Sequence, residues 1–295
     1  MKKKIYQGAC TALITPFTPT GTVDFAKIAE LVEFQIANGI DAIAPCATTG
    51  EAPTLIDEEH IEVIKTVVQQ VNKRVPVIAG TGSNDTHHAI ALSKAAQKAG
   101  ADAVLSVNPY YNKTSQKGLI AHFTDIAKSI DIPIILYNIP ARVNYNMTPA
   151  TMGELAKIEN IVGVKECNAA QAGEVRNYTG EDFLIVSGDD NAVLPILSLG
   201  GNGCISTAGN IIPKQMHDMV AKYLTGDNKG ATEIQLKILD LINSLFIEVN
   251  PMPIKAAMNI MGMNVGKCRL PLVDVEPQTI ATLTKTLEHY GLVKK

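Results

Sequence analysis

One apolar run of this sequence ends on a lysine. The run is Ile161-Val162-Gly163-Val164, and Lys165 follows where a buried strand would end. Lysine is normally kept in solvent, so this position suggests chemistry, although taken alone Lys165 could simply mark where the strand leaves the core. A neutral lysine amine attacks carbonyl carbon to form an imine, and burial favours that form by lowering the pKa of the amine. Lys165 is therefore a candidate imine-forming residue, provided that other segments place complementary groups beside it.

Complementary groups follow other apolar runs. Thr48 and Thr49 come after the run at 41–46, and Tyr137 and Arg142 come at and after the run at 133–137. The hydroxyl and backbone N–H donors around Thr48 and Thr49 could hold a keto-acid carboxylate. A Tyr137 phenol could transfer protons, and an Arg142 guanidinium could bind a second carboxylate. Each could instead be an ordinary loop or packing residue, but together they would suit a keto acid bound as an imine, without a metal.

These groups need a scaffold that gathers the ends of several strands. Short apolar runs alternate with longer amphipathic runs at intervals of roughly 25 to 35 residues, which is typical of β-α-β units. The apolar runs are continuous in Val, Ile, Leu and Ala, as in parallel strands buried on both faces. The predicted strands are 11–15, 41–46, 75–80, 103–107, 133–137, 161–165, 184–187 and 203–206.

Amphipathic runs predict helices between these strands. They lie at 25–37, 57–71, 85–99, 115–129 and 148–158, and further helices are predicted at 231–248, 253–261 and 277–289. Eight strand–helix units favour a closed (β/α)8 barrel, an α/β fold, over an open sheet. We expect the barrel to span residues 1–225 and a C-terminal helical extension to span 226–295. In such barrels the loops after the strands carry the active site.

Composition narrows the class of protein. The chain has 295 residues, 46% hydrophobic, with a net charge of -3 and no dense Lys/Arg stripe, which argues against nucleic acid as a partner. The apolar stretch after the N-terminal lysines is too short for an export signal or a membrane helix, so a cytoplasmic protein is expected. The five cysteines are scattered, with no CxxC pair, and predict reduced thiols and no metal site.

Seven segments together resemble one known family. They are TTGE at 48–51, PYYN at 109–112, YNIPAR at 137–142, VKE at 164–166, SGDD at 187–190, and NPMPIK at 250–255 with RLPL at 269–272. In order and spacing these are similar to the dihydrodipicolinate synthase family, within the N-acetylneuraminate lyase superfamily of lysine-dependent pyruvate aldolases. The resemblance covers nearly the whole chain.

The resemblance implies an activity and roles for the catalytic residues. Pyruvate would condense with aspartate semialdehyde to 4-hydroxy-tetrahydrodipicolinate, the step that commits carbon to diaminopimelate and lysine. Lys165 would form the pyruvate imine, so that no separate cofactor is needed, and Tyr137 would be the acid/base phenol. Thr48 would link Tyr137 by hydrogen bonds to Tyr111 of a neighbouring subunit. A homo-oligomer is implied, usually a tetramer made of two dimers.

The resemblance also assigns substrate-binding and regulatory positions. Thr49 would bind the pyruvate carboxylate, Arg142 the semialdehyde carboxylate, and Gly188 and the Ile205 backbone would flank the imine. In relatives inhibited by lysine, an interface pocket binds the effector. The matching residues here are Asn84, Tyr110 and His60, with His88 at the position expected to be glutamate. Because histidine offers no fixed negative charge to the ammonium of lysine, weak or absent lysine inhibition is expected.

Three departures from the family pattern concern the second substrate. Ala47 stands where glycine is usual, which would strain the loop if that residue has a positive φ. Val143 and Asn108 each replace a common threonine. Three alternatives stay open: a lyase for N-acetylneuraminate or a 2-keto-3-deoxy sugar acid, a barrel isomerase that binds phosphate at 200–203, and a non-catalytic metabolite-sensing relative.

Overall fold

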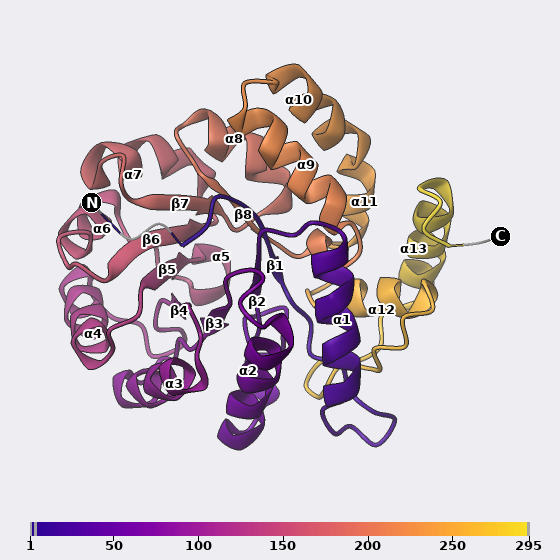
Figure 1. Ribbon diagram of the computed structural model, residues 1–295, viewed down its shortest axis with the longest axis horizontal. Helices are drawn as coiled ribbons and strands as arrows, with labels where there is room; N and C mark the ends of the chain where they lie inside the picture. The colour runs from indigo at the N-terminus through magenta and orange to yellow at the C-terminus, as the bar shows by residue number, and fades with distance from the viewer. Residues whose placement is uncertain (1, 3–4, 294–295) are drawn as a thin grey trace.

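A computed structural model describes residue 2 and residues 5–293 of the chain. Eight parallel strands form one sheet in the order β2-β1-β8-β7-β6-β5-β4-β3. A parallel bridge between Ile43 and Val77 joins the two outer strands, so the sheet closes on itself. The predicted (β/α)8 barrel is confirmed, and Figure 1 shows the strands at the centre with helices around them.

The strands and the longer helices between them lie close to their predicted positions. The strands are β1 (Gly8–Ala12), β2 (Ala42–Ala44), β3 (Ile78–Gly80), β4 (Ala103–Val107), β5 (Ile134–Asn138), β6 (Ile161–Glu166), β7 (Leu184–Ser187) and β8 (Gly203–Ser206). The α-helices up to β8 are α1 (Phe25–Ala37), α2 (Asp57–Val71), α3 (Thr86–Ala99), α4 (Gln116–Ser129), α5 (Pro140–Val143), α6 (Pro149–Leu155), α7 (Ala172–Thr179) and α8 (Val193–Ser198). After β8 come α9 (Pro213–Leu224), α10 (Asn228–Lys237), α11 (Leu239–Ser244), α12 (Met252–Ile260) and α13 (Pro277–His289).

Two predicted boundaries were wrong. Strand β1 lies about three residues before the predicted 11–15, because every residue from Gly8 to Phe17 is buried and hydrophobicity alone does not mark where pairing ends. The single helix predicted at 231–248 is two helices, α10 and α11, which meet at Ile238.

Two apolar clusters make up the core. One lies between the strands and the surrounding helices. The other consists mainly of alternate residues of the strands, such as Cys10 and Ala12 of β1 and Ala42 and Ala44 of β2, and therefore fills the barrel interior. Small side chains on β1 and β2 leave room inside the barrel for longer ones, including Tyr137 of β5.

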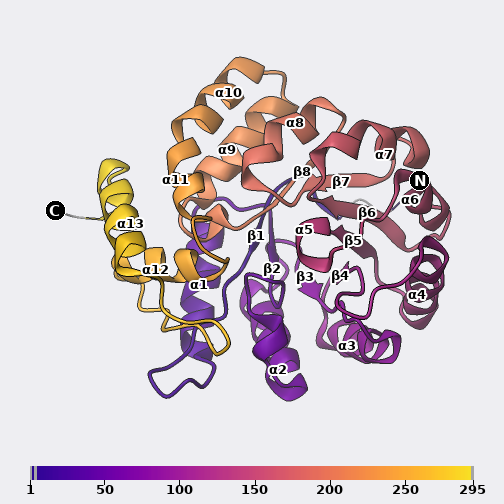
Figure 2. The same cartoon turned by 180° about the vertical axis from the view of Figure 1, so that it is seen from behind.

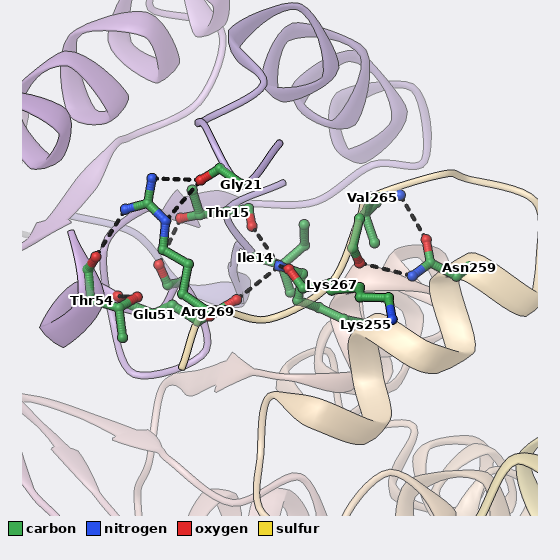
Figure 3. A network of polar contacts seen from close by, with 12 residues as sticks. Ile14, Thr15, Gly21, Glu51, Thr54, Lys255, Asn259, Val265, Lys267 and Arg269 are labelled. Atoms are coloured by element: carbon green, nitrogen blue, oxygen red, sulfur yellow. Dashed lines mark hydrogen bonds and ion pairs between the residues drawn. The ribbon is translucent and has the colours of Figure 1, made fainter. Parts of the chain in front are cut away.

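The C-terminal helices are tied to the barrel by buried charges. Figures 1 and 2 show α12 and α13 outside the ring of helices, on the side of α1. Lys255 of α12 donates hydrogen bonds to Glu51 Oε1 at 2.8 Å and to the carbonyls of Thr15 and Lys267. In Figure 3, Arg269 reaches between Gly21 and Thr54. These bonds hold the extension against the loop that carries the paired threonines.

Candidate active site

Lys165 and Tyr137 are neighbours inside the barrel. They lie directly opposite each other in the register of β5 and β6, and the Lys165 Nζ is 4.4 Å from the centre of the Tyr137 ring. Both side chains are 5% exposed. A Cβ atom at Gly188, after β7, would lie 2.3 Å from Cys167 Sγ and 3.0 Å from Lys165 Cε, so only glycine leaves space beside the lysine. The sequence correctly placed Lys165 and Tyr137 at one end of the barrel.

The electrostatic setting of Lys165 differs from the prediction. Burial lowers its pKa, but Tyr137, Cys167, Cys10 and Asp190 raise it, and the net direction is upward from 10.5. The prediction of a lowered pKa was therefore wrong in net direction, although burial is the largest single cause. Burial also raises the pKa of Tyr137, and it raises that of Cys167 to about 11. The phenol and the thiol are therefore uncharged near neutral pH. At that pH neither is an anion that could stabilise the Lys165 ammonium.

Replacing Tyr137 by phenylalanine tests its predicted role as a general acid/base. If Tyr137 has that role, we expect turnover to fall by about 10²- to 10⁴-fold. Burial raises the pKa of the phenol, so near neutral pH the substitution removes a proton donor and not a charge beside Lys165. The pH profile of turnover near neutral pH should therefore keep its shape while the rate falls. The exposed Tyr178→Phe is the control, and wild-type turnover in Tyr137→Phe would contradict the role.

The loop after β2 carries the paired threonines. Thr48 is half-buried, and its hydrogen bond to Tyr137 lowers the pKa of the phenol, against the larger effect of burial. Thr49 is buried, and its Oγ1 accepts a 3.0 Å hydrogen bond from Asn250 Nδ2. Ala47 does not have a positive φ, whereas Cys46 does, at 55°. The strain suspected at Ala47 is therefore absent there.

A cavity of about 370 Å³ lies at this mouth of the barrel. Thr48, Tyr137 and Arg142 line it, and Lys165 lies beside Tyr137 without lining it. Arg142, on α5, is exposed, and its Nη2 donates a 2.9 Å hydrogen bond to the Asn250 carbonyl. Figure 2 shows α5 near the barrel axis, beside β5 and β6. A guanidinium at the rim, a phenol in the wall and a lysine next to that phenol can receive an anionic carbonyl compound.

Of two further predicted site residues, Ile205 lies in the barrel interior and Tyr111 does not. Ile205 of β8 is buried in the interior cluster that also contains Tyr137. Tyr111 does not line the cavity of its own chain: it is 92% exposed with a φ of 66°. Within one chain, therefore, the structure does not bring Tyr111 to Thr48.

The predicted regulatory residues are only partly gathered. Tyr110, His60 and His88 line the same cavity as Tyr137, whereas Asn84 lines a separate one. His60 Nε2 is 2.7 Å from the Gly80 carbonyl, and burial lowers its pKa. His88 Nε2 is 2.9 Å from a carboxylate oxygen of Asp57.

Sequence reasoning assigned no role to three polar residues that support the site. Glu166 follows Lys165, and burial raises its pKa to about 7; it accepts hydrogen bonds from Asn138 and Gln171 at 2.9 Å. Asp190 accepts hydrogen bonds from the backbone N–H groups that follow β8. The third is Asn250. All three lie in VKE, SGDD and NPMPIK, which are motifs of the family resemblance.

Neither metal nor membrane features appear in the part of the chain that the structure describes. Residue 2 and residues 5–293 contain no cluster of three or more His, Cys, Asp or Glu side chains placed to hold a metal ion. Over the same residues, no helix combines the length and apolar character needed to cross a membrane.

Comparison with known proteins gives a consistent result. The model of the Dihydrodipicolinate synthetase family matches residues 5–290. The chain is 57% identical over 293 residues to the 4-hydroxy-tetrahydrodipicolinate synthase of Acetivibrio thermocellus, covering 99% of this chain and 100% of the relative. It is 41% identical, with a TM-score of 0.96, to the lysine-bound dihydrodipicolinate synthase of Cyanidioschyzon merolae, covering 99% of this chain and 100% of the other. It is 40% identical, with a TM-score of 0.96, to the dihydrodipicolinate synthase of Acinetobacter baumannii complexed with pyruvate, covering 98% of this chain and 100% of the other.

Proposed function

The chain belongs to the dihydrodipicolinate synthetase family, and on this premise we propose that it is a lyase that uses pyruvate and L-aspartate 4-semialdehyde. It condenses them to 4-hydroxy-tetrahydrodipicolinate, the first committed step of diaminopimelate and lysine biosynthesis. The observation that carries this function is the buried pair of Lys165 and Tyr137 beside a cavity with Arg142 at its rim, in a chain that matches the family over residues 5–290.

The reaction begins with an imine. The neutral Lys165 amine attacks the ketone carbon of pyruvate, and Tyr137 supplies the proton with which the former carbonyl oxygen leaves as water. Loss of a methyl proton from the iminium gives an enamine, whose carbon attacks the aldehyde. The semialdehyde amine then attacks the imine carbon, closes the ring and releases Lys165. One water is lost overall, and the lysine itself supplies the electron sink, so the scheme needs no separate cofactor.

The substrate-binding roles are part of this proposal. Thr49 binds the pyruvate carboxylate, and Gly188 and the Ile205 backbone border the imine. Arg142 binds the semialdehyde carboxylate, which its exposed position at the rim supports. Val143 lines the same cavity. Threonine is common at this position in the family, so the valine of this chain leaves the second substrate without that hydroxyl.

We also propose that the working form is a homo-oligomer, a tetramer made of two dimers, in the cytoplasm. The exposed Tyr111 supports this, because a phenol in solvent on one chain is accessible to a neighbouring subunit. Sedimentation of the wild-type protein and of Tyr111→Ala gives the assembly state, and an active monomer would contradict the shared site.

One experiment tests the chemistry and the choice of aldehyde. Pyruvate and borohydride are added together, and the peptide containing Lys165 is expected to gain the mass of reduced pyruvate. Coupled assays then compare aspartate semialdehyde with N-acetylmannosamine and glyceraldehyde. Faster consumption of either sugar aldehyde would favour a sugar-acid lyase, and pyruvate trapping without turnover of any aldehyde would favour a non-catalytic relative.

Lysine should inhibit this enzyme weakly or not at all. The ammonium of lysine would meet His88 where a carboxylate is needed, and His88 is already engaged by Asp57. We expect half-inhibition only above about 1 mM lysine in a steady-state titration. His88→Glu should increase sensitivity, and strong inhibition of the wild-type enzyme at sub-millimolar lysine would show that the pocket binds lysine without that glutamate.

A further inference from the structure

Asn250, which lies two positions before α12, contacts both candidate carboxylate-binding side chains, Thr49 and Arg142. Asn250 is 9% exposed, and its Nδ2 donates a 3.0 Å hydrogen bond to Thr49 Oγ1. Its backbone carbonyl accepts a 2.9 Å hydrogen bond from Arg142 Nη2. The side chain of Asn250 is therefore hydrogen-bonded to Thr49, and its backbone carbonyl is hydrogen-bonded to Arg142.

The direction of the first hydrogen bond determines what Thr49 can do. An amide nitrogen can only donate, so Thr49 Oγ1 must be the acceptor. Thr207 Oγ1 lies 3.2 Å from Thr49 Oγ1, and either hydroxyl can donate in that contact. Because Asn250 occupies a lone pair of Thr49, the Thr49 proton stays available for an acceptor. A bound carboxylate requires such a donor.

The other end of the same amide makes this arrangement specific. Asn250 Oδ1 is buried without a partner among the described residues. Of the two ends of the amide, only the nitrogen is hydrogen-bonded, and its partner is Thr49. An aspartate has nearly the same shape but two acceptor oxygens, so Thr49 would have to donate its proton to it. That substitution reverses the hydrogen bond and preserves packing, but it also adds a negative charge, so Asn250→Leu, which adds none, is compared with it.

We propose that Asn250 is a positioning residue for the first substrate: its amide orients the Thr49 hydroxyl as a donor to the pyruvate carboxylate. This inference rests on the proposed function, because it requires pyruvate to bind beside Thr49. Side-chain substitutions at Asn250 retain the backbone carbonyl that holds Arg142, so the site for the second substrate provides an internal control.

The test measures the pyruvate concentration that gives half-maximal borohydride trapping. In Asn250→Asp it should rise by about 10- to 100-fold, since a hydrogen bond to a charged group is lost. The half-saturating concentration of aspartate semialdehyde should change by less than about twofold. Asn243→Asp is the matched control, because Asn243 is exposed and belongs to the same C-terminal helices.

A double-mutant cycle distinguishes positioning from general destabilisation. Asn250→Leu removes the donor in a similar volume and should weaken pyruvate binding in the wild-type background, but not when Thr49 is already valine. An equal effect in both backgrounds would overturn the proposal, as would an unchanged trapping curve in Asn250→Asp. If the wild-type enzyme itself is not trapped with pyruvate, the proposed function fails and this inference fails with it.

Discussion

Replacement of Lys165 by methionine is expected to lower turnover by at least about 10⁴-fold and to abolish trapping of pyruvate by borohydride. Methionine has a similar length and suits the buried position beside Tyr137, so the variant should fold. It has no amine, and in the proposed reaction the activation of the pyruvate methyl group depends entirely on the iminium. The measurement is the steady-state rate together with the mass of the peptide that contains residue 165.

Lys165→Arg serves as the matched control for charge. It keeps a cation next to Tyr137, but a guanidinium stays protonated and does not form the imine. Both variants should therefore be inactive, with thermal unfolding close to that of the wild-type protein. Substantial turnover in either one, or mass gain on another lysine, would show that the imine forms elsewhere.

Replacement of Lys255 by methionine is expected to lower the free energy of unfolding by about 3 to 5 kcal/mol. Lys255 is 2% exposed, and its ammonium lies 4.3 Å from the centre of the Phe17 ring. Methionine retains most of the packing but leaves the buried carboxylate of Glu51 without its cation. Glu51 Oε2 would still accept from the Arg269 N–H at 2.9 Å. Denaturant unfolding, followed by circular dichroism, measures the loss.

An exposed ion pair provides the comparison for this stability effect. Lys157 and Glu154 are 2.7 Å apart but lie in solvent, so Lys157→Met should change the unfolding free energy by less than about 1 kcal/mol. Because Glu51 is the last residue of the TTGE segment, Lys255→Met should also disturb Thr49 and weaken pyruvate binding. A loss no larger than that of Lys157→Met would mean that the buried pair does not anchor the extension.

The sequence alone determined the barrel and the face that carries the chemistry. Continuous apolar runs identified all eight strands, because strands buried on both faces leave that pattern wherever they lie in the chain. Parallel strands also end on one side, so residues just after them share one mouth. This is why Lys165 and Tyr137 could be paired in advance, even though the bounds of β1 were misplaced.

Only the tertiary structure decided how the site is supported and charged. Asn250 meets Thr49 across 201 residues of sequence, and Lys255 meets Glu51 across 204. Such contacts depend on how the C-terminal helices pack on the barrel, and local periodicity carries no information about that packing. The net pKa of Lys165 likewise depends on groups from several strands, whose distances no single segment specifies. Local patterns identified the reactive groups, and packing between distant segments set their environment.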